Sequence, residues 1–240
     1  MTEIIKKIED YNVIEYEKSN IYIIENIIDD VFCDTIIHLI ETLPLIKVAH
    51  KYRQNVECYI AYTTELLKEN DEIFYIFPSN TSHTKSMYSN YLNGITNDEL
   101  QEQINKISEK MKIVSTIIKQ INNGISLNHN SGYNLRKIYG RTKIHSDGLI
   151  NIHDSDITFI NKEEETEEYK MVRNASIIFA LNDNYEGGIF HFPVQDISFK
   201  LKRGSVVIFP PYWTHPHEVS SVENGTFRYT INTWSCENIE

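Results

Sequence analysis

Two stretches in the first half of the chain repeat apolar residues at the spacing of an α-helix. Residues 28–43 (IDDVFCDTIIHLIETL) place apolar side chains on one face, and Asp29 or Asp30 can serve as the N-cap. Residues 99–124 keep the same spacing over a longer stretch that ends in a glycine suited to a C-cap. The pattern therefore predicts two amphipathic helices, the second about seven turns long.

From residue 130 onward, the pattern changes to short apolar or alternating runs. β-Branched and aromatic residues dominate these runs, and clusters of Gly, Pro, Asn and Asp separate them. The runs are LRKIYG, KIHSDGLI, ITFI, ASIIFALN, GGIFHFP, GSVVIFP and TFRYTINTW. This arrangement is typical of an antiparallel sandwich or barrel. A further apolar run at 21–27 predicts one strand just before the first helix.

No internal repeat or linker divides the chain, so we expect one domain over residues 1–240. Its class is α+β with a mainly β core: a helix-rich part at 1–130 supports a β core at 131–240. Residues 47–94 are rich in aromatic residues and allow no assignment of elements. The acidic run at 163–168 is interpreted as a solvated loop.

Charge restricts the classes of partner. The 240 residues include 23 Lys and Arg against 34 Asp and Glu, a formal net charge of −11. Nucleic-acid binding proteins draw much of their affinity from a basic surface, so this balance disfavours a nucleic-acid partner.

The cysteines and the apolar runs indicate the compartment. Cys33, Cys58 and Cys236 lie far apart and form neither a disulfide framework nor a zinc-binding spacing. The first residues contain no signal-peptide core, and no apolar run reaches about 18 residues. We therefore expect an intracellular, cytoplasmic protein that does not enter a membrane. The sequence does not predict its oligomeric state.

A possible metal site comes from an HxD pair and from a second histidine far along the chain. On a strand, His145 and Asp147 would leave the same face and bind one ion. About 70 residues later, the segment WTHPHEV offers His215 or His217, and Arg228 follows on an apolar strand. Two histidines and one carboxylate form the facial triad of non-haem Fe(II) oxygenases. A buried Arg needs an anionic partner, and a dicarboxylate co-substrate provides one through a bidentate pair.

Residues 135–234 resemble the 2-oxoglutarate- and Fe(II)-dependent dioxygenases of the prolyl 4-hydroxylase type. The matching segments are HSD at 145–147, LND-YEGGIFHFP at 181–193, KRGSVVIFP at 202–210, PHEV at 216–219 and RYTINTW at 228–234. They occur in the family's order and at about its spacings. The resemblance implies a double-stranded β-helix, which is a jelly-roll or cupin-like fold, with supporting helices from the N-terminal half.

The resemblance also implies roles for individual residues. His145, Asp147 and His217 would be the iron ligands, and Arg228 would pair with the far (C5) carboxylate of 2-oxoglutarate. Tyr139 matches a family position whose hydroxyl often lies near co-substrate or substrate, although a packing role fits it equally well.

Three further positions follow from the same comparison. Asn232 and Trp234 share the strand face of Arg228 by period-2 alternation, so they are candidates to line the pocket. Ala180 stands where some relatives use a Tyr to hold the co-substrate, so part of that contact set departs from the family pattern.

The implied reaction consumes O2 and 2-oxoglutarate, releases succinate and CO2, and hydroxylates a substrate C–H, with ascorbate as a candidate reductant. The favoured substrate is a prolyl or other residue of a protein or peptide. Alternatives are an oxygenase acting on a free amino acid or small metabolite, a nucleic-acid demethylase and a cupin-like binding protein without activity. The segment after Arg228 lacks the second Arg that such demethylases usually carry.

Overall fold

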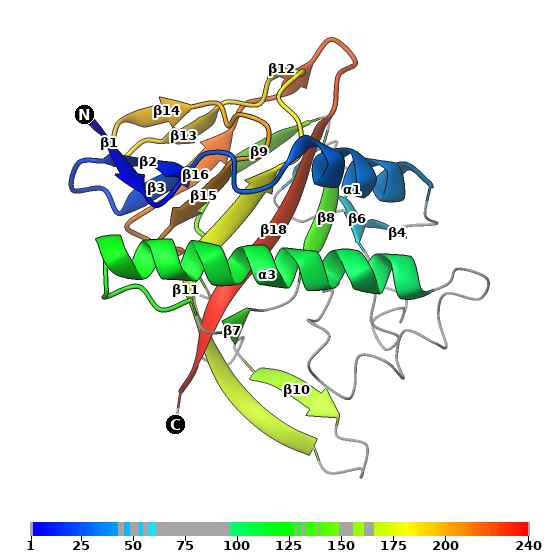
Figure 1. Cartoon of the computed structure of the whole chain (residues 1–240), viewed down its shortest axis with the longest axis horizontal. Coiled ribbons are helices and arrows are strands. Elements are labelled where there is room, and N and C mark those ends of the chain that lie inside the picture. The colour runs from blue at the N-terminus through cyan, green and yellow to red at the C-terminus, as the bar shows by residue number, and fades with distance from the viewer. Residues whose placement is uncertain are drawn as a thin grey trace.

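Figure 1 shows the computed structural model, and its described residues form a mainly β architecture with two helices. The residues that the structure describes are 2–42, 46–48, 53–54, 58–60, 97–127, 129–130, 133–138, 140–148, 156–160 and 166–239.

Both predicted helices are present. Helix α1 spans Asp30–Thr42 and α3 spans Asn97–Ile121. The N-cap of α1 is Asp29, because its Oδ1 accepts a hydrogen bond from the backbone N–H of Phe32 at 2.8 Å. No helix among the described residues is long and apolar enough to span a membrane.

The larger of two main sheets has nine strands within the described parts of the chain. They are β1 (Glu3–Ile8), β2 (Tyr11–Tyr16), β3 (Ile21–Ile24), β7 (His129–Asn130), β8 (Asn134–Ile138), β10 (Asp156–Ile160), β11 (Thr166–Ala180), β15 (Val206–Phe209) and β18 (Arg228–Ile239). The order is β1-β2-β3-β15-β11-β18-β7, with β10 paired to β11 and β8 paired to β18. All of these pairings are antiparallel.

The smaller sheet has the order β14-β13-β16-β9-β5. Its strands are β5 (Arg53–Gln54), β9 (Arg141–His145), β13 (Phe190–Phe192), β14 (Ile197–Phe199) and β16 (His217–Val219). Two short pairs complete the described strands: β4 (Ile46–Val48) with β6 (Cys58–Ile60), and β12 (Glu186–Gly187) with β17 (Val222–Glu223).

Two hydrophobic cores lie on opposite faces of the larger sheet. Along β11, Ala175, Ile177 and Phe179 belong to the core that α1 and α3 cover (Figure 1). Ile178 and Ala180 belong to the second core, which the smaller sheet covers with Phe190, Phe192, Ile197 and Val219. Successive side chains of a strand alternate between faces, so β11 separates a helix-covered side from a sheet-covered side.

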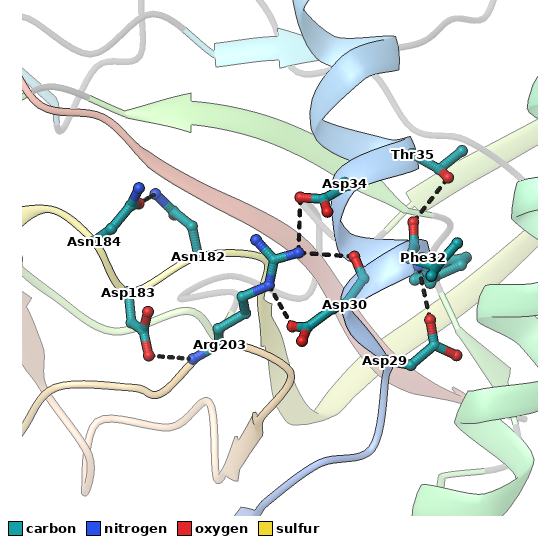
Figure 2. Close-up of polar contacts among 10 residues, drawn as sticks. Asp29, Asp30, Phe32, Asp34, Thr35, Asn182, Asp183, Asn184 and Arg203 are labelled. Atoms are coloured by element: carbon teal, nitrogen blue, oxygen red, sulfur yellow. Dashed lines mark hydrogen bonds and ion pairs between the residues drawn. The ribbon is translucent and has the colours of Figure 1, made fainter.

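Helix α1 is tied to the loop before β15 (Figure 2). The Nε of Arg203 donates to Asp30 Oδ1, and its Nη2 donates to the Asp30 carbonyl and to Asp34 Oδ1, each at 2.7 Å. The carboxylates are largely exposed, at 84% and 72%, so these ion pairs orient the helix more than they stabilise it. In the same loop, Gly204 has φ +77° and lies so close to Ile28 that a Cβ would be 2.6 Å from its carbonyl oxygen. This approach therefore requires glycine.

The chain differs from the sequence-based prediction at its N-terminus and in the acidic run. The hairpin of β1 and β2 was not predicted, because charged residues interrupt its alternation and β1 is almost entirely exposed at the sheet edge. Within the acidic run at 163–168, residues 166–168 are not loop: they begin β11 and pair with β10. Tyr139, residues 163–165 and most of 47–94 lie outside the described residues.

Candidate metal centre

Three residues of the predicted triad converge between the two strands β9 and β16. His145 ends β9 and lies directly across from His217, the first residue of β16. Asp147 follows two residues later in a turn, whose Gly148 N–H donates to the carbonyl of Pro211 at 2.6 Å. That bond holds the turn against the loop that leads to His217. One ligand atom from each of the three residues lies within 4.8 Å of the others.

The distances suit a common ion. His145 Nε2 lies 3.2 Å from Asp147 Oδ1, and His217 Nε2 lies 3.8 Å from Asp147 Oδ2. Ligands about 2.1 Å from one metal and at right angles to each other are about 3 Å apart, so a small closure of the triad would complete the site. Two imidazole nitrogens and one carboxylate on one side of the ion match the donor set of a non-haem Fe(II) centre, with coordination positions left for other ligands.

Backbone carbonyls set the tautomer of both histidines. Nδ1 of His145 lies 2.8 Å from the carbonyl of Lys143, and Nδ1 of His217 lies 3.2 Å from the carbonyl of His215. A carbonyl only accepts, so each Nδ1 carries the proton and donates it. Each Nε2 is then left with a lone pair that is directed to the metal position.

Aromatic rings fix the orientation of the distal histidine. His217 is 3% exposed. Its ring stacks on Phe192 at a centroid distance of 5.4 Å and meets the edge of Phe209 at 4.8 Å. The imidazole is therefore packed against aromatic rings of the second core, which exclude water and leave it few accessible rotamers.

Asp147 is held ionised. Its side chain is 11% exposed, and this burial alone would raise the pKa. Before a metal binds, the positive charge of a protonated His217 and the hydrogen bonds that a protonated His145 and Ser176 donate outweigh burial and hold the pKa of Asp147 well below its usual range. Metal binding would displace the Nε2 protons. The carboxylate is therefore ready to bind a cation at neutral pH.

Arg228, the first residue of β18, is 5% exposed and lies over the Phe190 ring at 5.0 Å. Phe190 and Phe192 are two residues apart on β13, so they share a face at a spacing of about 6.6 Å. The guanidinium thus packs on one ring and the ligand His217 on the next.

Tyr185 adds a polar group near Arg228 that sequence reasoning missed. The residue is 3% exposed, and its hydroxyl has no hydrogen-bond partner within the part of the chain that the structure describes. Burial raises the pKa of Tyr185, and the charge of Arg228 opposes this rise. Asn182, three residues earlier, bonds to both sides of Arg228 through the Phe227 carbonyl and the Tyr229 N–H.

The other residues named from the sequence do not belong to the metal group. Asn232 and Trp234 are buried and lie opposite Ile178 and Ser176 of β11, on the face that carries the second core. The side-chain Oδ1 of Asn232 accepts a hydrogen bond from Thr230 Oγ1 at 2.7 Å. His215 does not join the metal group: its Nε2 donates to the carbonyl of Ser19 at 2.6 Å.

Comparison with known families identifies this arrangement. Residues 136–236 match the family described as the 2OG-Fe(II) oxygenase superfamily. The matched part contains all three residues of the metal group and Arg228. The match and the His-Asp-His group together imply an enzyme that uses Fe(II) and 2-oxoglutarate as cofactors.

Similar solved structures cover most of the chain at low identity. The viral collagen prolyl hydroxylase vCPH of Paramecium bursaria Chlorella virus-1, in its 2OG complex, has 18% identity and a TM-score of 0.52, over 91% of this chain and 96% of that chain. A Trichoplax adhaerens prolyl hydroxylase bound to a peptide of hypoxia inducible factor has 12% identity and a TM-score of 0.54, over 91% and 84%. A Pseudomonas putida prolyl-4-hydroxylase has 12% identity and a TM-score of 0.50, over 90% and 92%. No curated protein sequence matches the chain significantly. At these identities, the similarity establishes the fold.

Proposed function

We propose that this protein is an Fe(II)- and 2-oxoglutarate-dependent oxygenase that hydroxylates a prolyl or other residue of a protein or peptide. The observation that carries the proposal is the cluster of His145, Asp147 and His217, with Arg228 buried one aromatic ring further along β13. We also infer that the two facing sheets form the double-stranded β-helix of this superfamily.

Each residue of the metal group would have its own role in the reaction. His145, Asp147 and His217 would hold Fe(II), which together with 2-oxoglutarate supplies the oxidising chemistry of the site. Their arrangement on one side leaves the positions that face the pocket open. The neutral imidazoles, held by the carbonyls of Lys143 and His215, contribute no charge of their own. Asp147 therefore supplies the only negative charge among the three ligands.

The pocket wall supplies the position for the co-substrate. Arg228 offers a bidentate donor pair to the far carboxylate, in a buried environment where such a pair is strong. The Tyr185 hydroxyl is a second donor for the same carboxylate, and Ala180, buried in the second core, has no hydroxyl to offer at the position where some relatives use Tyr. Phe190 and Phe192 exclude water from the pocket wall between Arg228 and the metal group.

Binding of 2-oxoglutarate to a Mn(II)- or Co(II)-loaded protein tests the co-substrate site. We expect Arg228→Ala to retain the metal but to weaken 2-oxoglutarate binding at least tenfold, since a buried charge-assisted pair is lost. Tyr185→Phe, which removes only the hydroxyl, should weaken binding by a smaller factor. Tyr212→Phe removes the hydroxyl of a tyrosine that is 41% exposed, so it serves as the matched control. Unchanged affinity in Arg228→Ala would refute its role.

The substrate class rests on a separate argument. Three similar solved structures are described as prolyl hydroxylases, and one of them holds a peptide. The net charge of −11 also makes a polyanionic substrate unfavourable.

A substrate comparison tests this class. Proline-containing peptides, free proline and other free amino acids would each be incubated with the complete enzyme, Fe(II) and 2-oxoglutarate. The proposal predicts that peptides gain the mass of one oxygen atom and that this gain maps to proline or another single side chain. Oxidation of free amino acids alone would favour the small-molecule alternative.

A further inference from the structure

Strand β11, which carries residues that contact Asp147, is irregular in its pairing with β18. In the pairing of β11 with β18, Arg173 lies opposite Cys236, and Ala175 lies opposite Ser235. Two steps along β11 therefore correspond to one step along β18, so Asn174 is an extra residue: a β-bulge. Its side chain is anchored, because Nδ2 donates to the carbonyl of Ser126 at 2.7 Å.

The bulge changes which side chains share a face. Arg173 and Ser176 are three residues apart, and on a regular strand they would point to opposite faces of the sheet. The extra residue restores them to the same face, where both contact Asp147. Arg173 Nη1 donates to the backbone carbonyl of Asp147 at 2.8 Å, and Ser176 Oγ donates to its Oδ2 at 2.7 Å.

Both contacts are built into a buried wall. Ser176 is 1% exposed and lies opposite Trp234 on β18. The guanidinium of Arg173 lies over the Trp234 ring at 4.0 Å, which restricts its movement. Arg173 thus holds the backbone of Asp147, while Ser176 holds one of its two carboxylate oxygens.

The geometry points to Arg173 and Ser176 as positioning residues that make Asp147 bind the metal through Oδ1 alone. Oδ2 accepts the Ser176 hydroxyl and lies 3.8 Å from His217 Nε2, whereas Oδ1 makes the shorter approach, 3.2 Å from His145 Nε2. A carboxylate free to rotate would present both oxygens to the ion and occupy one more coordination position. The bulge therefore preserves an open position that the proposed oxygenase needs for its co-substrates.

Titration of the whole protein with Mn(II) or Co(II) tests this role without 2-oxoglutarate or substrate. Ser176→Thr and Ser176→Val have nearly the same shape and differ mainly by the hydroxyl. Contacts of this kind typically contribute about 10–100-fold in metal affinity, so we expect Val to lose about that factor and Thr to stay near wild type. The Co(II) absorption spectrum should also change in the Val variant, because the carboxylate can then bind through both oxygens.

Ser108→Ala provides the matched control. The Ser108 hydroxyl donates to the Ile104 carbonyl within α3 at 3.0 Å, on the helix-covered side of the larger sheet and away from the metal group. It should lower stability without changing metal affinity. Equal affinity and an equal Co(II) spectrum in Ser176→Val and Ser176→Thr would overturn the positioning role while leaving the proposed function intact. Absence of metal binding by wild type would instead contradict the proposed function itself.

Discussion

The three residues of the metal group were predictable as a set, whereas their immediate partners were not. HxD at 145–147 is weak evidence by itself, and the prediction depended on its occurrence in one order with PHEV at 216–219 and the other family-like segments. The partners of these ligands include a carbonyl of Lys143, a serine on β11 and an aromatic ring on β13. Such contacts depend on the register between distant strands, and no local pattern carries that information.

Two cysteines offer a test of burial at the residue scale. Burial raises the pKa of both Cys33 and Cys236 to about 11, against an ordinary value of about 8.5. At pH 8 both thiols should be protonated and unreactive in the folded protein, and iodoacetamide should label them only after denaturation. Peptide mass spectrometry measures each site separately. Rapid labelling of either cysteine in the native protein would contradict the packing around it.

The same two thiols predict a dependence of stability on pH. The fold favours their neutral form, so the unfolded chain releases thiol protons at lower pH than the folded chain does. Their contribution to the free energy of unfolding is complete below about pH 8.5 and falls as the pH rises toward 11. Replacement of both residues by Ala should flatten that part of a urea-unfolding profile measured against pH.

Among the elements, α1 and α3 were predictable because helical periodicity is local and their end signals are strong. The residues 28–43 predicted a helix, and the structure has it at Asp30–Thr42. The bulge in β11 was not predictable, since no local feature of the sequence shows that Asn174 is an extra residue within the strand. Only pairing with β18 reveals the extra residue, and with it the shared face of Arg173 and Ser176.

The N-cap of α1 gives a prediction at the element scale. Asp29→Ala removes the acceptor for the Phe32 N–H and should lower the free energy of unfolding by about 1 kcal/mol, whereas Asp29→Ser should retain most of the stability. Chemical unfolding measures both variants. Metal affinity should stay unchanged, because α1 lies on the helix-covered side of the sheet. A loss of metal binding in a folded Asp29→Ala protein would indicate coupling that the two separate cores do not explain.

At the scale of the whole molecule, one hydrophobic core supports the larger sheet and the other adjoins the metal group. The helices cover one face of the larger sheet, and the metal group lies with the second core between the two sheets. The mainly β second half was predictable from its short β-branched runs, but the order of the strands was not. Neighbours such as β3 and β15 are about 180 residues apart in sequence, so their pairing leaves no short-range signal.

Formation of succinate from 2-oxoglutarate with Fe(II) and O2 tests the central claim most directly. It would be measured in wild type, in Asp147→Ala and in the Ser108→Ala control. The account predicts Fe(II)-dependent succinate formation by wild type and by the control, and its loss in Asp147→Ala together with metal binding. Absence of Fe(II)-dependent turnover in wild type, or equal turnover in Asp147→Ala, would contradict it.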